Sequence, residues 1–238
     1  MWKNILANLP EVTPPSQKHL SFKEKLKWTG IILVIFFFLG LIPLFGLGQN
    51  ALQQFEFLSL ILGAEFGSII SLGIGPLVTS SIVLQLLNGS GILKFDLNTT
   101  EGKTTFQGVQ KLLSVFFIIF EACIYVLMGG LAPDLAFSGT SSFFQLEMIL
   151  IFQLILGGIL IMFMDEVVAK WGFGSGISLF IAAGVSKQLF VRILSPLPSP
   201  TNPEIPSGAI PALIHSLSGG DVITSLLMIA AILATIFI

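Results

Sequence analysis

Few residues of this 238-residue chain have the type and spacing needed for covalent chemistry. Ser90 and Ser175 lie in Asn-Gly-Ser-Gly and Phe-Gly-Ser-Gly, and neither has the glycine two positions before the serine that is typical of intramembrane serine proteases. His19 and His215 fall in predicted loops, and the zinc motif His-Glu-x-x-His does not occur in the sequence. The adjacent carboxylates Asp165-Glu166 predict a solvated patch rather than paired catalytic acids. We therefore expect no enzymatic activity and no cofactor.

Carboxylates inside apolar stretches are more informative. Glu121 lies about midway along the apolar run 112–132, where a charged carboxylate costs roughly 2.5–3.5 kcal/mol on insertion scales. It must therefore face water or protein. Either it belongs to a functional polar contact, or it is a neutral side chain hydrogen-bonded between helices, and the two interpretations are compatible.

Two further carboxylates lie in a membrane-spanning pattern that is interrupted. Glu56 and Glu65 belong to an apolar run that is too short to cross a bilayer, and a full span is predicted directly after it, over Ile69–Leu87. The interruption consists of Gly63, Gly67, Gly73, Gly75 and Pro76. Non-helical backbone at membrane depth is tolerated only where protein covers it or where it lines a water-filled cavity. The pattern therefore favours a path through the membrane over a simple anchor.

The composition indicates a polytopic membrane protein. Charged residues make up 10% of the chain and hydrophobic residues 54%, against about 25% charged in soluble domains. Runs long enough to span a bilayer are Thr29–Gly48, Ile69–Leu87, Leu112–Ala132, Leu146–Met164, Phe173–Leu194 and Val222–Ile238. We expect an all-α membrane helical bundle with five full transmembrane helices, a sixth cut short at 222–238, and a short re-entrant half-helix before the second. The net charge of −2 is uninformative about nucleic acid, but the sequence has no basic patch interleaved with aromatics, so we expect no nucleic acid to be read directly.

The distribution of basic residues predicts the orientation. Of the 11 lysines and arginines, all but Lys187 and Arg192 fall on the side of the N-terminus, which is therefore expected to be cytoplasmic. Residues 1–27 form an N-terminal segment in which Ser21–Trp28 reads as a short amphipathic helix, with Ser21 and Glu24 in a capping box, and a disordered basic leader is the alternative. Residues 28–194 hold the first five spans, and Ser195–Asp221 is a Pro-rich external loop expected to be extended.

Four runs of this sequence resemble the SecY family, the pore-forming α subunit of the Sec protein-translocation channel. They are FKEKLKWTGI (22–31), LGIGPLVTSSIVLQLLNGSG (72–91), FQGVQKLLS (106–114) and MDEVVAKWGFGSGISLFIAAGVS (164–186). The resemblance extends from about residue 11 to residue 186 and is closest to the archaeal and eukaryotic branch. Members of the family have ten spans in two pseudo-symmetric halves, so this chain corresponds to the first half and part of the sixth span, and we expect it to be truncated.

The resemblance implies roles for three groups of residues. A plug over about 54–67 would include Phe55, Glu56, Phe57, Leu58, Leu60, Ile61, Leu62, Gly63, Glu65 and Phe66. Half of an aliphatic pore ring would consist of Ile74, Val78, Ile177 and Ile181. A polar cluster at the lateral gate would contain Thr79 and Glu121. Without the resemblance, a static re-entrant turn and ordinary contacts with lipid or with neighbouring helices would explain the same residues.

The implied function is a protein-conducting channel that passes unfolded secretory chains across the membrane and releases hydrophobic segments laterally into lipid. Implied partners are a SecE-type γ subunit, a small β-type subunit, a ribosome or cytosolic motor, signal peptides, nascent polypeptides and the lipid bilayer. The expected location is the cell membrane, as in archaea. Two alternatives remain open, a secondary transporter with a broken-helix substrate site and an assembly subunit.

Overall fold

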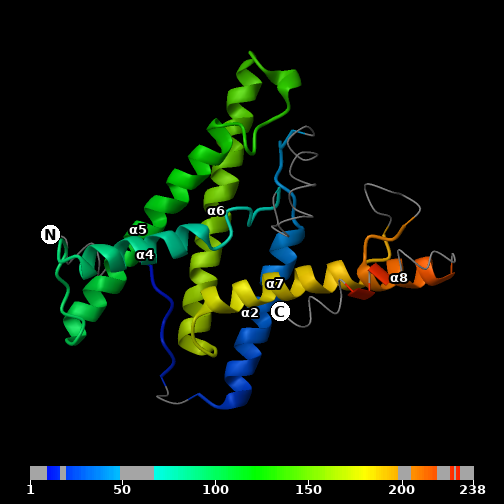
Figure 1. The fold of residues 1–238 in the computed structure, drawn as a ribbon. Helices are drawn as coiled ribbons and strands as arrows, with labels where there is room; N and C mark the ends of the chain where they lie inside the picture. Colours follow the sequence, from blue (N-terminus) through cyan, green and yellow to red (C-terminus); the bar gives the residue numbers. More distant parts are fainter. Residues whose placement is uncertain are drawn as a thin grey trace. The chain divides into compact units, whose positions relative to one another are not determined.

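The computed structural model describes residues 10–16, 20–48, 67–197, 205–218, 226–227 and 229–230. Within these ranges the regular secondary structure is helical (Figure 1), and an isolated β-bridge joins Pro43 and Ser68. The elements are α2 (Phe22–Leu41), α4 (Gly75–Gly89), α5 (Thr100–Leu127), the 3₁₀ turn η1 (Leu135–Phe137), α6 (Ser141–Trp171), α7 (Gly176–Leu194) and α8 (Ala209–Ser218). The chain divides into two compact units, Met1–Ile181 and Ala182–Ile238.

Two described helices, α5 with 28 residues and α6 with 31, are long and apolar enough to cross a membrane. They contain the predicted spans Leu112–Ala132, up to its last turn, and Leu146–Met164. Both are longer than predicted because polar turns extend them at the helix ends. The first turn of α5, for example, is capped by Thr99, whose Oγ1 accepts from the N–H of Gly102 at 3.1 Å.

The capping box predicted at Ser21 is present, but the boundary predicted after it is wrong. The N–H of Glu24 donates to Ser21 Oγ at 3.3 Å, and the N–H of Ser21 donates to Glu24 Oε2 at 3.2 Å. From this cap α2 continues without a break to Leu41, so the amphipathic segment and the first span are one helix. No proline interrupts it until Pro43, which ends it well before the predicted boundary at Gly48.

The second span begins later than predicted. Residues 67–74 form successive turns rather than helix, and α4 starts only at Gly75, with Pro76 in its first turn. Gly73 has a φ of +55°, a conformation that side chains with a Cβ rarely adopt. The non-helical interruption therefore extends into the apolar run that composition alone assigns to the helix Ile69–Leu87.

The loop predicted to be extended, Ser195–Asp221, is also different. Its second part forms α8, in which Pro211 occupies the first turn, where the missing N–H is not needed. The residues before it turn back on themselves, since the N–H of Ser207 donates to the carbonyl of Leu197 at 2.7 Å. Of the predicted sixth span, Val222–Ile238, only residues 226–227 and 229–230 are described, and they are helical.

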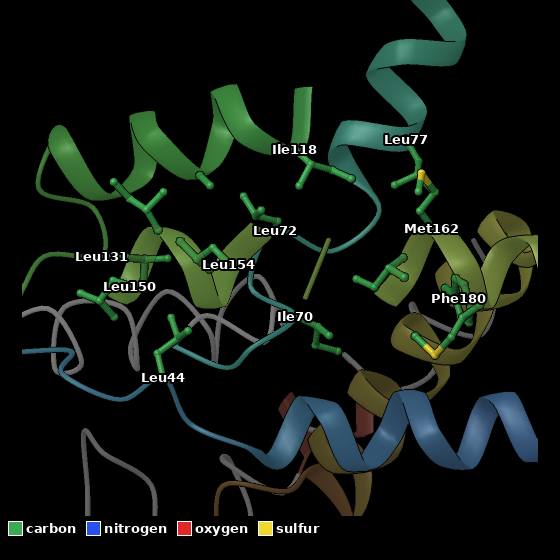
Figure 2. Close-up of a cluster of buried hydrophobic side chains, with 14 of the residues drawn as sticks. Leu44, Ile70, Leu72, Leu77, Ile118, Leu131, Leu150, Leu154, Met162 and Phe180 are labelled. Carbon is green, nitrogen blue, oxygen red and sulfur yellow. The ribbon is translucent and has the colours of Figure 1, made fainter. Parts of the chain in front are cut away.

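In the first unit α6 packs against both α5 and α2, and α4 packs against α5. Figure 2 shows the buried side chains that fill these interfaces. Fully buried members are Ile118, Leu131, Leu150, Leu154 and Ile161. Two glycines of α6 make the close approach possible: a Cβ at Gly157 would lie 1.9 Å from the carbonyl oxygen of Ile69, and one at Gly158 would lie 2.7 Å from Ile118.

Candidate functional site

Backbone hydrogen bonds join the two ends of the interrupted segment, at residues 42–44 and 67–69, and we call this pairing the base of the segment. The N–H of Leu44 donates to the carbonyl of Gly67 at 2.8 Å, and the N–H of Ile69 donates to the carbonyl of Ile42 at 3.0 Å. The chain therefore passes Leu44 on its way into residues 49–66 and returns to the same place at Gly67. The predicted plug residues Phe55 to Phe66 lie outside the described ranges, and of the predicted plug 54–67 only Gly67 is described.

A glutamine of α6 holds this base, and sequence reasoning missed it. Gln153 accepts from the N–H of Phe45 through Oε1 and donates to the carbonyl of Phe45 through Nε2, each at 3.0 Å. A neutral amide in the middle of the apolar helix α6 was the available signal, because a polar group at membrane depth needs a hydrogen-bond partner. The base of the segment is therefore positioned by α6 as well as by its own backbone pairing.

The predicted ring residues lie at the beginnings of α4 and α7. Ile74 is the N-cap residue of α4, and its carbonyl accepts from the N–H of Val78 at 3.0 Å. Ile177 is in the first turn of α7, with Ile181 one turn further on. Ile74 and Ile177 are half-buried and pack against the same hydrophobic core.

A hollow of about 670 Å³ lies in the first unit, bordered by α5, α6 and the first turns of α4 and α7. Its lining changes in character from one part to another. Leu77 and Met162 are buried, and with Ile177 they form an apolar part, whereas Glu101 and Thr104 are exposed polar residues. The hollow therefore extends from an exposed polar mouth to buried apolar side chains that include one predicted ring residue.

Charged side chains at the mouth of the hollow bind residues 10–13. Lys111 of α5 forms an ion pair with Glu166 of α6, and it also donates to the carbonyl of Pro10. The second oxygen of Glu166 accepts from the N–H of Val12 at 3.0 Å. The prediction of a solvated patch at Asp165-Glu166 is thus wrong, since Glu166 is engaged in a half-buried ion pair.

The next turn of α6 holds the same segment. Lys170 forms an ion pair with Glu11 and donates to the carbonyl of Val12 at 2.6 Å, and Trp171 Nε1 donates to the carbonyl of Thr13 at 3.0 Å. The hydrogen bond from Lys170 holds the pKa of Glu11 below its usual range. We call residues 10–13 the strap, because they contact both Lys111, within α5, and the last turns of α6.

The two predicted gate residues lie on α5 and α4. Glu121 is half-buried on α5, and its carboxylate reaches the start of α4, where a Cβ at Gly75 would lie 3.3 Å from Oε2. Thr79 is half-buried on α4, one turn after Gly75. Glycine at position 75 therefore leaves room for the carboxylate beside the first turn of α4.

A second polar contact between α4 and α5 was not predicted. The hydroxyls of Ser80 and Ser114 are 2.6 Å apart, and Gln110 Nε2 donates to Ser81 Oγ at 2.5 Å. Ser80 is completely buried. The available signal was the pair Gln110 and Ser114, which are four residues apart at the beginning of the predicted span Leu112–Ala132 and would share one helix face. These hydrogen bonds hold α4 against α5 close to the hollow.

An all-α membrane fold with an interrupted segment beside a hollow defines a class, helical membrane proteins with a discontinuous span. Comparison with known proteins gives the family. A model of SecY matches residues 68–238, and a model described as the plug domain of Sec61p matches residues 34–67. The chain belongs to the SecY family, which confirms the resemblance.

Relatives named protein translocase subunit SecY support this. The one from Methanothermobacter thermautotrophicus is 52% identical over 217 residues, covering 91% of this chain and 46% of the relative. The one from Pyrococcus horikoshii is 43% identical over 218 residues, covering 89% and 46%. The chain therefore spans about half the length of the curated relatives that it matches.

Solved structures agree with the fold. One described as the structure of a protein conducting channel has a TM-score of 0.76 and 38% identity, covering 100% of this chain and 50% of that one. Sec61 from a canine ribosome–channel complex gives the same values. The yeast Ssh1 complex bound to the 80S ribosome gives a TM-score of 0.68 at 26% identity, covering 91% of this chain and 44% of that one. The predicted all-α membrane fold is confirmed.

Proposed function

We propose that this chain forms the first half of a protein-conducting channel, which passes unfolded secretory polypeptides across the membrane and releases apolar segments into lipid. The observation that carries the proposal is the hollow, whose polar mouth leads to buried Leu77 and Met162 and to Ile177. Such a lining suits a polypeptide, which is polar along its backbone and variable in its side chains. No covalent change is part of this function, so the chain would act without a cofactor of its own.

The constriction would be formed in part by Ile74, Val78, Ile177 and Ile181. A narrow collar of aliphatic side chains loses its water and blocks ions, while the flexible side chains can yield to a passing chain. Two features support the assignment. Ile177 lines the hollow, and Ile74, at the start of α4, packs against the same core as Ile177.

The plug would be residues 54–67. Support comes from the match of residues 34–67 to the plug domain of Sec61p and from the tied base at Leu44 and Gly67. A segment whose two ends meet can change its conformation without moving the helices on either side. Gly67, with a φ of +85°, provides a backbone hinge at the return point.

The lateral gate would include Thr79 and Glu121. Both residues lie at the start of α4 or beside it, and they would place polar groups in a mainly apolar seam. Opening such a seam exposes these groups to lipid or to an entering signal sequence. Their interactions would therefore set the balance between the closed and open seam.

The partners proposed are a ribosome or a cytosolic motor, a SecE-type γ subunit, a β-type subunit, and signal peptides with their nascent chains. Solved relatives seen with ribosomes support the first of these. We propose the cell membrane as the location, with the N-terminus in the cytoplasm. The contacts of the strap with Lys111 and Lys170 support placing these two lysines and the N-terminal segment on one side.

The function is tested by reconstituting a chain completed to the length of its relatives with a labelled secretory precursor, beside an uptake assay for small solutes. Translocation of the precursor is expected, and solute uptake without it would favour the secondary transporter. Resting conductance tests the constriction. The double variant Ile74→Asn/Ile181→Asn should leak ions, whereas Val83→Asn/Phe190→Asn, on other faces of the same helices, should not. An unchanged resting current in the first variant would count against the ring.

A further inference from the structure

The beginning of α7 requires hydrogen-bond acceptors that its own sequence barely provides. The first N–H groups of a helix have no partner within the helix, and a serine directly before the helix usually accepts from one of them. Ser175 occupies that position, but its hydroxyl lies 3.4 Å from the nitrogen of Ser178, at the outer limit for a hydrogen bond. The local cap of α7 is therefore weak.

The missing acceptor comes from another helix. Asp165, near the end of α6, accepts from the N–H of Ile177 through Oδ1 at 2.9 Å. The residue between Ser175 and Ile177 must be small for this contact to form. A Cβ at Gly176 would lie 2.7 Å from both the Cα and Oδ1 of Asp165. The ends of α6 and α7 thus meet without spare room, and one carboxylate joins them.

Asp165 differs in this respect from its charged neighbours on α6. Glu166 pairs with Lys111 of α5 and accepts from the N–H of Val12, and Lys170 pairs with Glu11, so both of these side chains hold the strap. Asp165 points instead to the main chain of α7 and lines the same hollow as Ile177. Asp165 therefore contacts the first turn of α7, whereas Glu166 and Lys170 contact the strap.

We propose that Asp165 is a positioning residue for the constriction. By accepting from the N–H of Ile177 it sets the place of the first turn of α7, and with it the place of the Ile177 side chain. The proposal rests on the proposed function for the role of Ile177 in the seal. The position of α7 itself can be measured independently of that role.

The first experiment measures this position directly. Ile177→Cys is introduced into the completed chain, from which Cys123 and any cysteine of the added half have been removed by substitution with alanine. The rate of labelling by a water-soluble maleimide is recorded in membrane vesicles. Asp165→Ala should change the rate about fivefold, as expected for the loss of a side-chain cap. Asp165→Asn keeps an acceptor oxygen and should stay within about twofold. Ser175→Ala is the matched control on the same turn, and it should also stay within about twofold because its hydrogen bond is long.

The second experiment records resting conductance for the same three variants without the cysteine. A leak in Asp165→Ala alone supports both the positioning and the seal. A changed labelling rate without a leak supports the positioning by Asp165 and counts against the ring of the proposed function. Equal labelling in Asp165→Ala and Ser175→Ala overturns the proposal. If Asp165→Ala does not accumulate in the membrane, Asp165→Glu replaces it. The longer side chain displaces the carboxylate and should change the labelling rate in the same direction. A labelling rate of Asp165→Glu equal to that of the wild type overturns the proposal.

Discussion

The helices α4 and α7 begin in similar ways but are held by different forces. Each follows a turn that contains a glycine with positive φ, Gly73 at +55° and Gly174 at +122°. Each has an isoleucine at its start, Ile74 as the N-cap residue and Ile177 in the first turn. The start of α4 has no side-chain cap, whereas the start of α7 receives one from another helix.

The difference follows from Pro76. A proline in the first turn has no N–H, so α4 has one fewer group to satisfy, and Pro76 and Leu77 are buried in the core. The first turn of α7 keeps its N–H groups and depends on Asp165. In the proposed constriction, apolar packing therefore positions the start of α4, whereas a polar contact between helices positions the start of α7.

The largest effect is expected on the α4 side. Gly157→Ala would place a Cβ 1.9 Å from the carbonyl oxygen of Ile69, a main-chain atom that cannot move away cheaply. Overpacking of this kind should cost about 3 kcal/mol of stability or more and should displace the turn before α4. Thermal denaturation in detergent measures it. Gly89→Ala, where nothing lies within 4 Å of the added Cβ, is the control, and equal stability of the two variants would contradict packing as the force that seats α4.

The next largest effect is expected on the α7 side. Gly176→Ala brings a Cβ to 2.7 Å from Asp165 and should separate the carboxylate from the N–H of Ile177. The expected cost is about 1–3 kcal/mol, in the range of overpacking and of a lost helix cap. The same denaturation assay applies, with Gly184→Ala in α7 as the control because its Cβ would meet nothing within 4 Å. A melting temperature like that of the control would mean that α7, like α4, is seated without a cap.

A smaller effect is expected where a carboxylate approaches α4. Glu121→Leu removes a polar group beside Gly75, and polar contacts between membrane helices are worth about 0.6–2 kcal/mol. We expect a several-fold change in the open fraction of the gate with intact assembly. Translocation of reporters with graded signal-sequence hydrophobicity would show a moved threshold. Glu121→Gln, which keeps a polar side chain, should leave the threshold close to wild type, and no movement in either variant would identify Glu121 as an ordinary packing residue.

The smallest effect is expected at the strap, which contacts the same end of α6 as the cap of α7. Because the pKa of Glu11 is lowered by its hydrogen bond from Lys170, its ionised form stabilises the contact, fully so above the usual glutamate pKa of about 4.3. The stabilisation is lost as the pH falls through the lowered value. A fluorophore on Thr13→Cys, with Cys123→Ala, should report release of the strap on acidification. Glu11→Gln should reduce this pH response. Glu147→Gln, at the other end of α6, is the control and should leave the response unchanged. The same pH response in both variants would exclude Glu11 as its origin.

The last prediction concerns the topology of the chain in the membrane, and it is tested by labelling rather than by a change in stability. Lys25, Lys94 and Lys170 should react from the cytoplasmic side after substitution by cysteine, and residues 195–221 from outside. The result decides from which side the hollow is entered. Reaction of position 94 only from outside would reverse the proposed orientation, in which the N-terminus is cytoplasmic.

Much of the fold could be read from the sequence because it depends on local or compositional physics. Apolar runs of membrane length predict spanning helices, and α5 and α6 have that length. The capping box of Ser21 and Glu24 is a contact between residues three apart and is present as expected. The interruption before Pro76 also follows from residue type, since glycine and proline act on the backbone at their own positions.

Element boundaries were less accessible to the same reasoning. The division of α2 at Trp28 was wrong because a change from polar to apolar composition does not by itself break a helix. The helix α8 was missed because prolines nearby outweighed the apolar spacing after Gly208. In both cases the backbone followed hydrogen bonding within the helix rather than composition.

The sequence by itself determined a helical membrane protein with an interrupted segment and with candidate residues at its break. Only the tertiary structure decided which helix supports which break: Gln153 the base of the segment, Glu166 the strap, and Asp165 the start of α7. The physical reason is distance along the chain. These side chains satisfy main-chain groups 12, 108 and 154 positions away, and no local pattern specifies which buried polar group meets which orphaned N–H.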